Sequence, residues 1–122
     1  MDNQCICKIR NIYRAIGAFE LKLEDAFGMN INEVMLLCVL SECESLLSGE
    51  IADELNLTRS NASKVIASLE KKGYIRRKAC EHDSRCQRFH ITRKGTEQMR
   101  RVNCDSFHVP PNLEGLLSVE TI

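Results

Sequence analysis

Two short helices separated by a break are encoded in residues 48–73, which read SGEIADELNLTRSNASKVIASLEKKG. Ser48 and Thr58 carry hydroxyl groups of the kind that cap helix N-termini. The second helix has one apolar and one polar face, and Gly73 is suited to the left-handed residue that ends it. Its apolar residues, at helical spacing, are Ala62, Val65, Ile66 and Leu69. This stretch therefore predicts a helix-turn-helix.

The residues that follow change to an apolar alternation of period two, which is typical of strands. They predict a hairpin over residues 74–92, with its second strand beginning at Cys86. In the register that places Ile75 opposite Ile91, Cys80 falls opposite Cys86. A hairpin directly after a helix-turn-helix predicts a winged helix-turn-helix, a fold that is mostly α with a small β-hairpin wing.

Helical patterns on both sides of this core predict three further helices. A second helix begins after Asn30 or Asn32 and runs to about Cys43, and the last begins at Thr96. The first helix ends near Gly28, and its apolar face consists of Ile6, Ile9, Tyr13, Ile16, Phe19, Leu23 and Phe27. We expect three parts: an N-terminal helix (1–29), a winged helix-turn-helix domain (30–95) and a C-terminal helix and tail (96–122).

The formal net charge of the whole chain is zero, but the charges are unevenly distributed. Residues 58–101 contain thirteen Lys and Arg against four Asp and Glu, a net charge of +9, so the remainder carries −9. A basic segment of this size is typical of a surface that binds a polyanion such as double-stranded DNA. The alternative is a solvated helix surface without a partner.

Composition and motifs exclude several classes of protein. With 43% hydrophobic and 28% charged residues, the chain is neither disordered nor fibrous. It contains no run of about 18 apolar residues and no secretory signal, so we expect a cytoplasmic protein without membrane contact. No catalytic motif is recognisable, and we therefore expect neither an enzyme nor a cofactor.

The polar face of the helix predicted over residues 58–72 offers side chains suited to duplex DNA. Short polar groups reach base edges in the major groove, and a capped N-terminus directs backbone N–H groups at a phosphate. This would make it the recognition helix. The candidate contacts on it are Thr58, Arg59, Ser60, Asn61, Ser63 and Lys64.

The hairpin supplies a second group of candidate DNA contacts. Arg85, near the tip, is expected to reach a minor groove or the backbone. Asp83 would hold its guanidinium through a bidentate contact. The cations expected to contact phosphates without reading sequence are Arg76, Arg77, Lys78 and Arg88.

Four segments of the chain resemble one known family. They read LSGEIADEL (47–55), LEKKGYIRR (69–77), DSR (83–85) and ITRKG (91–95). Together, over about residues 30–100, they look like the MarR family of bacterial transcriptional regulators. The Asp-x-Arg wing followed by Ile-Thr-x-x-Gly is the most specific part of the match.

The resemblance implies a homodimer that binds a palindromic operator, usually as a repressor, and is released by a small-molecule effector or by thiol oxidation. By this analogy Ser60, Asn61, Ser63 and Lys64 lie toward bases, and Arg85 lies in a minor groove. Residues 1–29 and 96–122 would form the dimer interface. Family members usually end in long C-terminal helices, and little of the chain follows Asp105, so the interface is expected to be smaller or to rely more on residues 1–27.

Cysteines and histidines in the hairpin raise an alternative. Zinc ligands could be supplied by Cys80, His82, Cys86 and His90. Cys80 and Cys86 could instead form a reversible disulfide, beside cations that favour a thiolate. Cys5 and Cys7 are further redox candidates. One alternative function is thus a thiol- or metal-responsive sensor with DNA binding as its output; another is a winged-helix module that binds protein.

Overall fold

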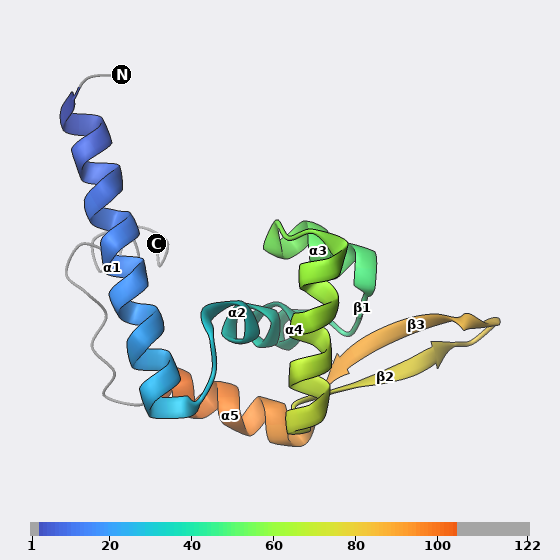
Figure 1. Ribbon diagram of the computed structural model, residues 1–122. Helices are drawn as coiled ribbons and strands as arrows, with labels where there is room; N and C mark the ends of the chain where they lie inside the picture. The colour runs from blue at the N-terminus through green and yellow to red at the C-terminus, as the bar shows by residue number, and fades with distance from the viewer. Residues whose placement is uncertain (1–2, 105–122) are drawn as a thin grey trace. The chain divides into compact units, whose positions relative to one another are not determined.

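The computed structural model describes residues 3–104, which form five helices and three strands (Figure 1). In chain order these are α1 (Asn3–Phe27), α2 (Ile31–Glu42), β1 (Leu46–Leu47), α3 (Ser48–Leu55), α4 (Arg59–Lys72), β2 (Ile75–Cys80), β3 (Asp83–Ile91) and α5 (Arg93–Cys104). They divide into two compact units, α1 with the residues up to Asn30, and the elements from α2 to α5. Much of the predicted C-terminal part, 96–122, lies outside the described residues.

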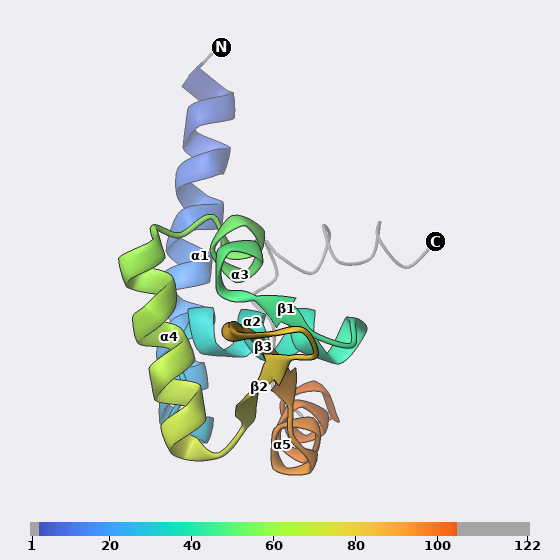
Figure 2. The same ribbon diagram turned by 90° about the vertical axis from the view of Figure 1, so that its right-hand side faces the viewer.

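The second unit is a winged helix-turn-helix, which confirms the predicted fold class. Helices α3 and α4 pack against each other and against α2, and β2 and β3 form the hairpin wing. Figure 2 looks along the hairpin and shows α4 on one side of the strands and α5 on the other. The most deeply buried side chains of this unit are Leu36, Leu37, Leu40, Ile51 and Leu69. Each contributes about 1.5–3 kcal/mol to folding by leaving water.

A two-residue strand, β1, was not expected from the sequence. Leu46 and Leu47 pair antiparallel with Phe89 and Arg88 of β3, so the sheet has the order β1–β3–β2. Phe89 is buried. The strand thus fixes the start of the helix-turn-helix to the wing.

The start of α3 also differs from the prediction that Ser48 caps it, which is wrong. Leu47 occupies the N-cap position and has no polar side-chain atom. Its backbone N–H instead donates to Glu50 Oε1 at 2.8 Å. Ser48 is displaced into the first helical position because pairing of β1 with β3 keeps Leu47 extended.

Helix α5 begins at Arg93, earlier than the predicted start at Thr96. Thr92 explains the difference, because its Oγ1 accepts a hydrogen bond from the Gly95 N–H at 3.1 Å. Gly95 is buried against the hairpin. A Cβ there would collide with the Tyr74 carbonyl oxygen and lie 2.8 Å from Ile91 Cγ1. The Ile-Thr-x-x-Gly motif therefore joins α5 to the wing.

The hairpin follows the predicted register for most of its length and departs from it at the tip. Ile75 pairs with Ile91, as predicted. Cys80, however, pairs with Asp83 after a register shift, so its predicted position opposite Cys86 in the ladder is wrong. Strand β3 begins at Asp83 because a bulge inserts extra residues into it.

Helix α1 ends at Phe27, as predicted, and Gly28 follows with φ 65°. Part of its predicted apolar face is exposed, since Ile6 and Ile9 are each 55% exposed and Tyr13 is 78% exposed. Among residues 3–104, no helix is long and apolar enough to cross a membrane.

Candidate nucleic-acid interface

Helix α4 begins and ends as its sequence predicts. Thr58 occupies the N-cap position, and its Oγ1 accepts a hydrogen bond from the Asn61 N–H at 3.1 Å. Gly73 ends the helix in the left-handed conformation, with φ 81°. The predicted apolar face is buried. The contacts predicted on this helix and its cap are all exposed, and these are Thr58, Arg59, Ser60, Asn61, Ser63 and Lys64.

The inner side of α4 is also held by a polar contact that sequence reasoning missed. Glu33 of α2 is 3% exposed, and its Oε2 accepts hydrogen bonds from Ser68 Oγ and Lys72 Nζ, each at 2.8 Å. The carboxylate lies far from both partners in the sequence, so helical spacing carries no signal of the contact. Two bonds from α4 to one carboxylate on α2 restrain rotation of α4 about its axis.

Arg77, predicted to contact phosphate, is paired with a carboxylate of its own chain. Its Nε and Nη2 donate to Glu70 Oε2 and Oε1 at 2.8 and 2.6 Å, and its guanidinium lies 5.3 Å from the centre of the Phe89 ring. These hydrogen bonds lower the pKa of the Glu70 carboxyl and raise the pKa of Arg77. Arg77 thus joins β2 to the last turns of α4.

Arg88 also has protein partners. Its Nε donates to Ser45 Oγ at 2.6 Å, and its Nη2 donates to the Ser45 carbonyl at 3.4 Å and lies 3.8 Å from Glu50 Oε1. Arg88 therefore ties β3 to the residues before β1. Phosphate contact by Arg88 stays a prediction, as does phosphate contact by Arg77. Each guanidinium would have to bind a phosphate in addition to its protein partners.

At the wing tip, the side chain of Arg85 projects into solvent. Its side chain is 96% exposed. Asp83 Oδ1 accepts a hydrogen bond from the Arg85 backbone N–H at 2.9 Å but lies 3.9 Å from Nε. The predicted bidentate contact between the two side chains is therefore wrong, because Asp83 orders the backbone of the tip instead. The other wing cations, Arg76 and Lys78, are exposed.

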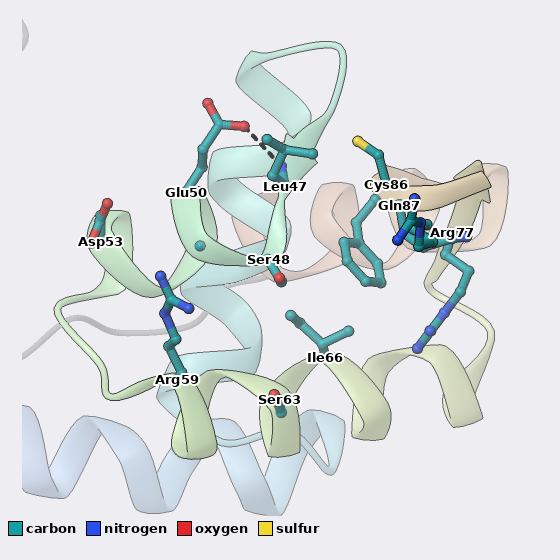
Figure 3. Close-up of a pocket in the computed structure, with 13 residues that line it drawn as sticks. Leu47, Ser48, Glu50, Asp53, Arg59, Ser63, Ile66, Arg77, Cys86 and Gln87 are labelled. Carbon is teal, nitrogen blue, oxygen red and sulfur yellow. Dashed lines mark hydrogen bonds between the residues drawn. The ribbon is translucent and has the colours of Figure 1, made fainter. Parts of the chain in front are cut away.

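A groove of about 770 Å³ lies between α3, α4 and the wing (Figure 3). Figure 3 shows Arg59, Ser63 and Ile66 projecting from α4 toward α3. The charged and polar residues that line the groove are Ser48, Glu50, Asp53, Arg59, Ser63, Arg77, Arg85 and Gln87. Of the predicted DNA contacts, Arg59, Ser63, Arg77 and Arg85 thus meet around one concave surface. The remaining candidates on α4 are exposed but do not line it.

The two cysteines of the hairpin are joined. Cys80 and Cys86 form a disulfide, with their Cα atoms 5.2 Å apart, so in this state their sulfurs are not free thiolates for zinc. Within residues 3–104, no three His, Cys, Asp or Glu residues are grouped as metal ligands would be. Cys5 and Cys7 of α1 are exposed. Cys38 is a partly buried thiol whose pKa is raised by burial and by the charge of Glu42.

Comparison with known proteins gives one consistent family. Residues 29–87 match the model of the MarR family. Over 83 residues the chain is 35% identical to the transcriptional repressor MprA of Escherichia coli. This match covers 66% of the present chain and 47% of MprA. The chain thus spans about half the length of the curated relatives it matches.

Solved structures resemble the chain over nearly all of its length. The transcriptional regulator BldR from Sulfolobus solfataricus has a TM-score of 0.73 and 25% identity, covering 99% of both chains. Sco3205, a MarR family transcriptional regulator from Streptomyces coelicolor solved in complex with DNA, has a TM-score of 0.69 and 26% identity, covering 99% of this chain and 86% of that one.

Proposed function

Because residues 29–87 match the MarR family model, we propose that this chain is a DNA-binding regulator of transcription of that family, which reads duplex DNA with α4 and contacts the neighbouring backbone or minor groove with its wing. One observation carries the proposal: α4 presents an exposed polar face while its other side is fixed to the fold. A helix held in this way enters the major groove as a rigid body.

The chemistry of that face supports sequence reading. Ser60, Asn61 and Ser63 carry short side chains near the N-terminus of α4, where hydrogen-bond donors and acceptors approach base edges. Arg59 and Lys64 flank them and supply charge for phosphates or for guanine. Removing one of these contacts is expected to cost about 1–3 kcal/mol of discrimination between sequences.

Charge on the wing supports a second contact. Arg85 is nearly fully exposed, and an extended cation of this kind fits a narrow minor groove. It lines the same groove as Arg59 and Ser63, so one duplex could meet α4 and the wing together. Because Arg77 and Arg88 are paired within the fold, fewer cations contribute to affinity than the charge of residues 58–101 alone suggests.

A second copy of the chain is the proposed partner of α1. Ile6, Ile9 and Tyr13 recur at three- and four-residue steps and are largely exposed, and such a face is stabilised when another helix covers it. A two-fold dimer would place two copies of α4 on a palindromic operator. Repression by occupancy of the operator is the proposed output, in line with the repressor MprA.

Light scattering tests the dimer directly. The chain is expected to have the mass of two copies, and Ile9→Asp, which places a charge in the apolar face, is expected to shift it toward one copy. A monomeric wild type would overturn the proposed partner of α1.

Fluorescence anisotropy with a labelled duplex of mixed sequence tests the DNA contact. Binding is expected at low salt and should weaken steeply as salt rises. The double variant Arg59→Ala/Lys64→Ala should weaken it, whereas Arg100→Ala, which removes an exposed cation of α5, should have little effect. Absence of binding at low salt would overturn the proposal and favour the protein-binding module.

A further inference from the structure

A buried carboxylate between α2 and α4 takes part in none of the proposed DNA contacts. Glu33 lies in the first turn of α2 and is 3% exposed. Its Oε2 accepts hydrogen bonds from Ser68 Oγ and Lys72 Nζ of α4, each at 2.8 Å. We call these three residues the Glu33 clamp. Through one oxygen atom, the clamp ties the proposed recognition helix to α2.

The Glu33 clamp holds α4 in a way that the apolar face of the helix does not. Val65, Ile66 and Leu69 are buried, but apolar burial is non-directional, so a small rotation of the helix costs it little. Hydrogen bonds, in contrast, weaken steeply as their angles become unfavourable. Ser68 and Lys72 lie about one turn apart and share one acceptor atom. The clamp therefore fixes both the rotation of α4 and its position along its axis.

Stability alone does not explain why a charge occupies this position. Removing a carboxylate from water is costly, and replacing a buried ion pair with apolar residues of similar volume is often neutral or stabilising. The same helix is already anchored by apolar burial, since Leu36, Leu37 and Leu40 are at most 1% exposed. What the carboxylate adds is a fixed geometry between α2 and α4, which a leucine at this position would not supply.

The rotation that the Glu33 clamp fixes determines where the reading face of α4 points. Ser68 follows Asn61 by seven residues and Lys72 follows it by eleven, so each lies within about 20° of Asn61 around the helix axis. A helix with its side chains is about 10–12 Å wide, and a rotation of about 20° moves the side-chain ends by about 2 Å. A hydrogen bond to a base edge does not survive a displacement of that size.

We propose that Glu33 is a positioning residue for sequence reading: through Ser68 and Lys72 it fixes the rotation of α4, and so sets the preference of the protein for its operator over other duplexes. The inference rests on the proposed function, because it concerns DNA reading by α4. Phosphate contacts carry no sequence information, so affinity for DNA of any sequence does not depend on Glu33.

Anisotropy titrations against two labelled duplexes test the inference. One duplex is the operator that the wild type selects from genomic fragments, and the other has a mixed sequence. The ratio of the two affinities is the readout, because a loss of folded protein weakens both by the same factor and leaves the ratio unchanged. In E33L/S68A, which lacks the acceptor and one donor of the clamp, the ratio is expected to fall about five- to 150-fold, the equivalent of one lost base contact. Affinity for the mixed duplex and its salt dependence should stay the same.

Lys72 offers a second pair of variants that leaves the buried position intact, since its side chain is 35% exposed. K72R retains a cationic donor and is expected to keep the wild-type ratio, whereas K72M should lower it. Direct contact of Lys72 with a phosphate would instead weaken both duplexes equally and reduce the salt slope by about one. The matched control is E42Q, which removes an exposed carboxylate of α2 that approaches Cys38 of the same helix. It should leave the ratio unchanged.

An unchanged ratio in E33L/S68A, with circular dichroism showing a folded protein at the assay temperature, would overturn the inference alone. Equal weakening of both duplexes by K72M would overturn it as well. If E33L/S68A does not fold, the comparison of K72M with K72R decides by the same ratio. A wild type that prefers no duplex would overturn the proposed function and this inference with it.

Discussion

Gly95→Ala is expected to destabilise the winged helix unit, although alanine is the better helix former. The added Cβ would collide with the Tyr74 carbonyl oxygen and lie 2.8 Å from Ile91 Cγ1. That carbonyl accepts the Thr92 N–H at 2.9 Å, so moving it away stretches a hydrogen bond between the hairpin and α5. Overpacking costs about 1–3 kcal/mol and the strained bond up to about 1 kcal/mol, while the helix preference of alanine returns about 0.5–1 kcal/mol.

Urea and thermal unfolding, followed by circular dichroism, measure the net loss of about 1–3 kcal/mol. For a unit of this size each kcal/mol lowers the Tm by about 4–8 °C. Gly49→Ala is the matched control, because a Cβ at Gly49 meets nothing within 4 Å. It is expected to leave stability unchanged or slightly higher. If Gly95→Ala is as stable as Gly49→Ala, the close approach of α5 to the hairpin is wrong.

Three further predictions concern charged groups. Glu33→Gln should lower the free energy of unfolding by about 1–3 kcal/mol in urea titrations, since Ser68 and Lys72 lose a charged acceptor; an unchanged value would contradict the restraint on α4. Arg77 lowers the pKa of Glu70 in the folded state, so this pair stabilises the fold above the unfolded pKa of about 4.3 and loses that contribution as the pH falls through the folded pKa. Glu70→Gln should therefore flatten the acid limb of the stability curve, by less than about 1 kcal/mol, and an identical curve would refute the pairing. Arg85→Ala should reduce the slope of log affinity against log salt by about one, with Arg100→Ala as a control of unchanged slope.

The elements that sequence reasoning predicted well are those encoded by local patterns. Helix α4 has a cap, an apolar face and a terminal glycine within one short stretch, and each is found where the pattern places it. The register of Ile75 with Ile91 likewise follows from alternation alone. In both cases neighbouring residues carry the whole signal.

The features that were missed depend on partners distant in the sequence. Strand β1 is only two residues long and exists because β3 pairs with it. Arg88 is hydrogen-bonded to Ser45, and the inner side of α4 is hydrogen-bonded to Glu33. Spacing along the chain cannot show such contacts. The shifted register at the wing tip is a bulge, which alternation does not reveal.

The exposed face of α4 is proposed to read a specific DNA sequence. Selection of genomic fragments by the purified protein, followed by sequencing, tests whether it does so. The wild type is expected to enrich one palindromic sequence, whereas Asn61→Ala/Ser63→Ala should lose or change that preference while still binding DNA at low salt. Recovery of the same palindrome by this variant, or enrichment of no sequence by the wild type, would show that α4 does not read the sequence.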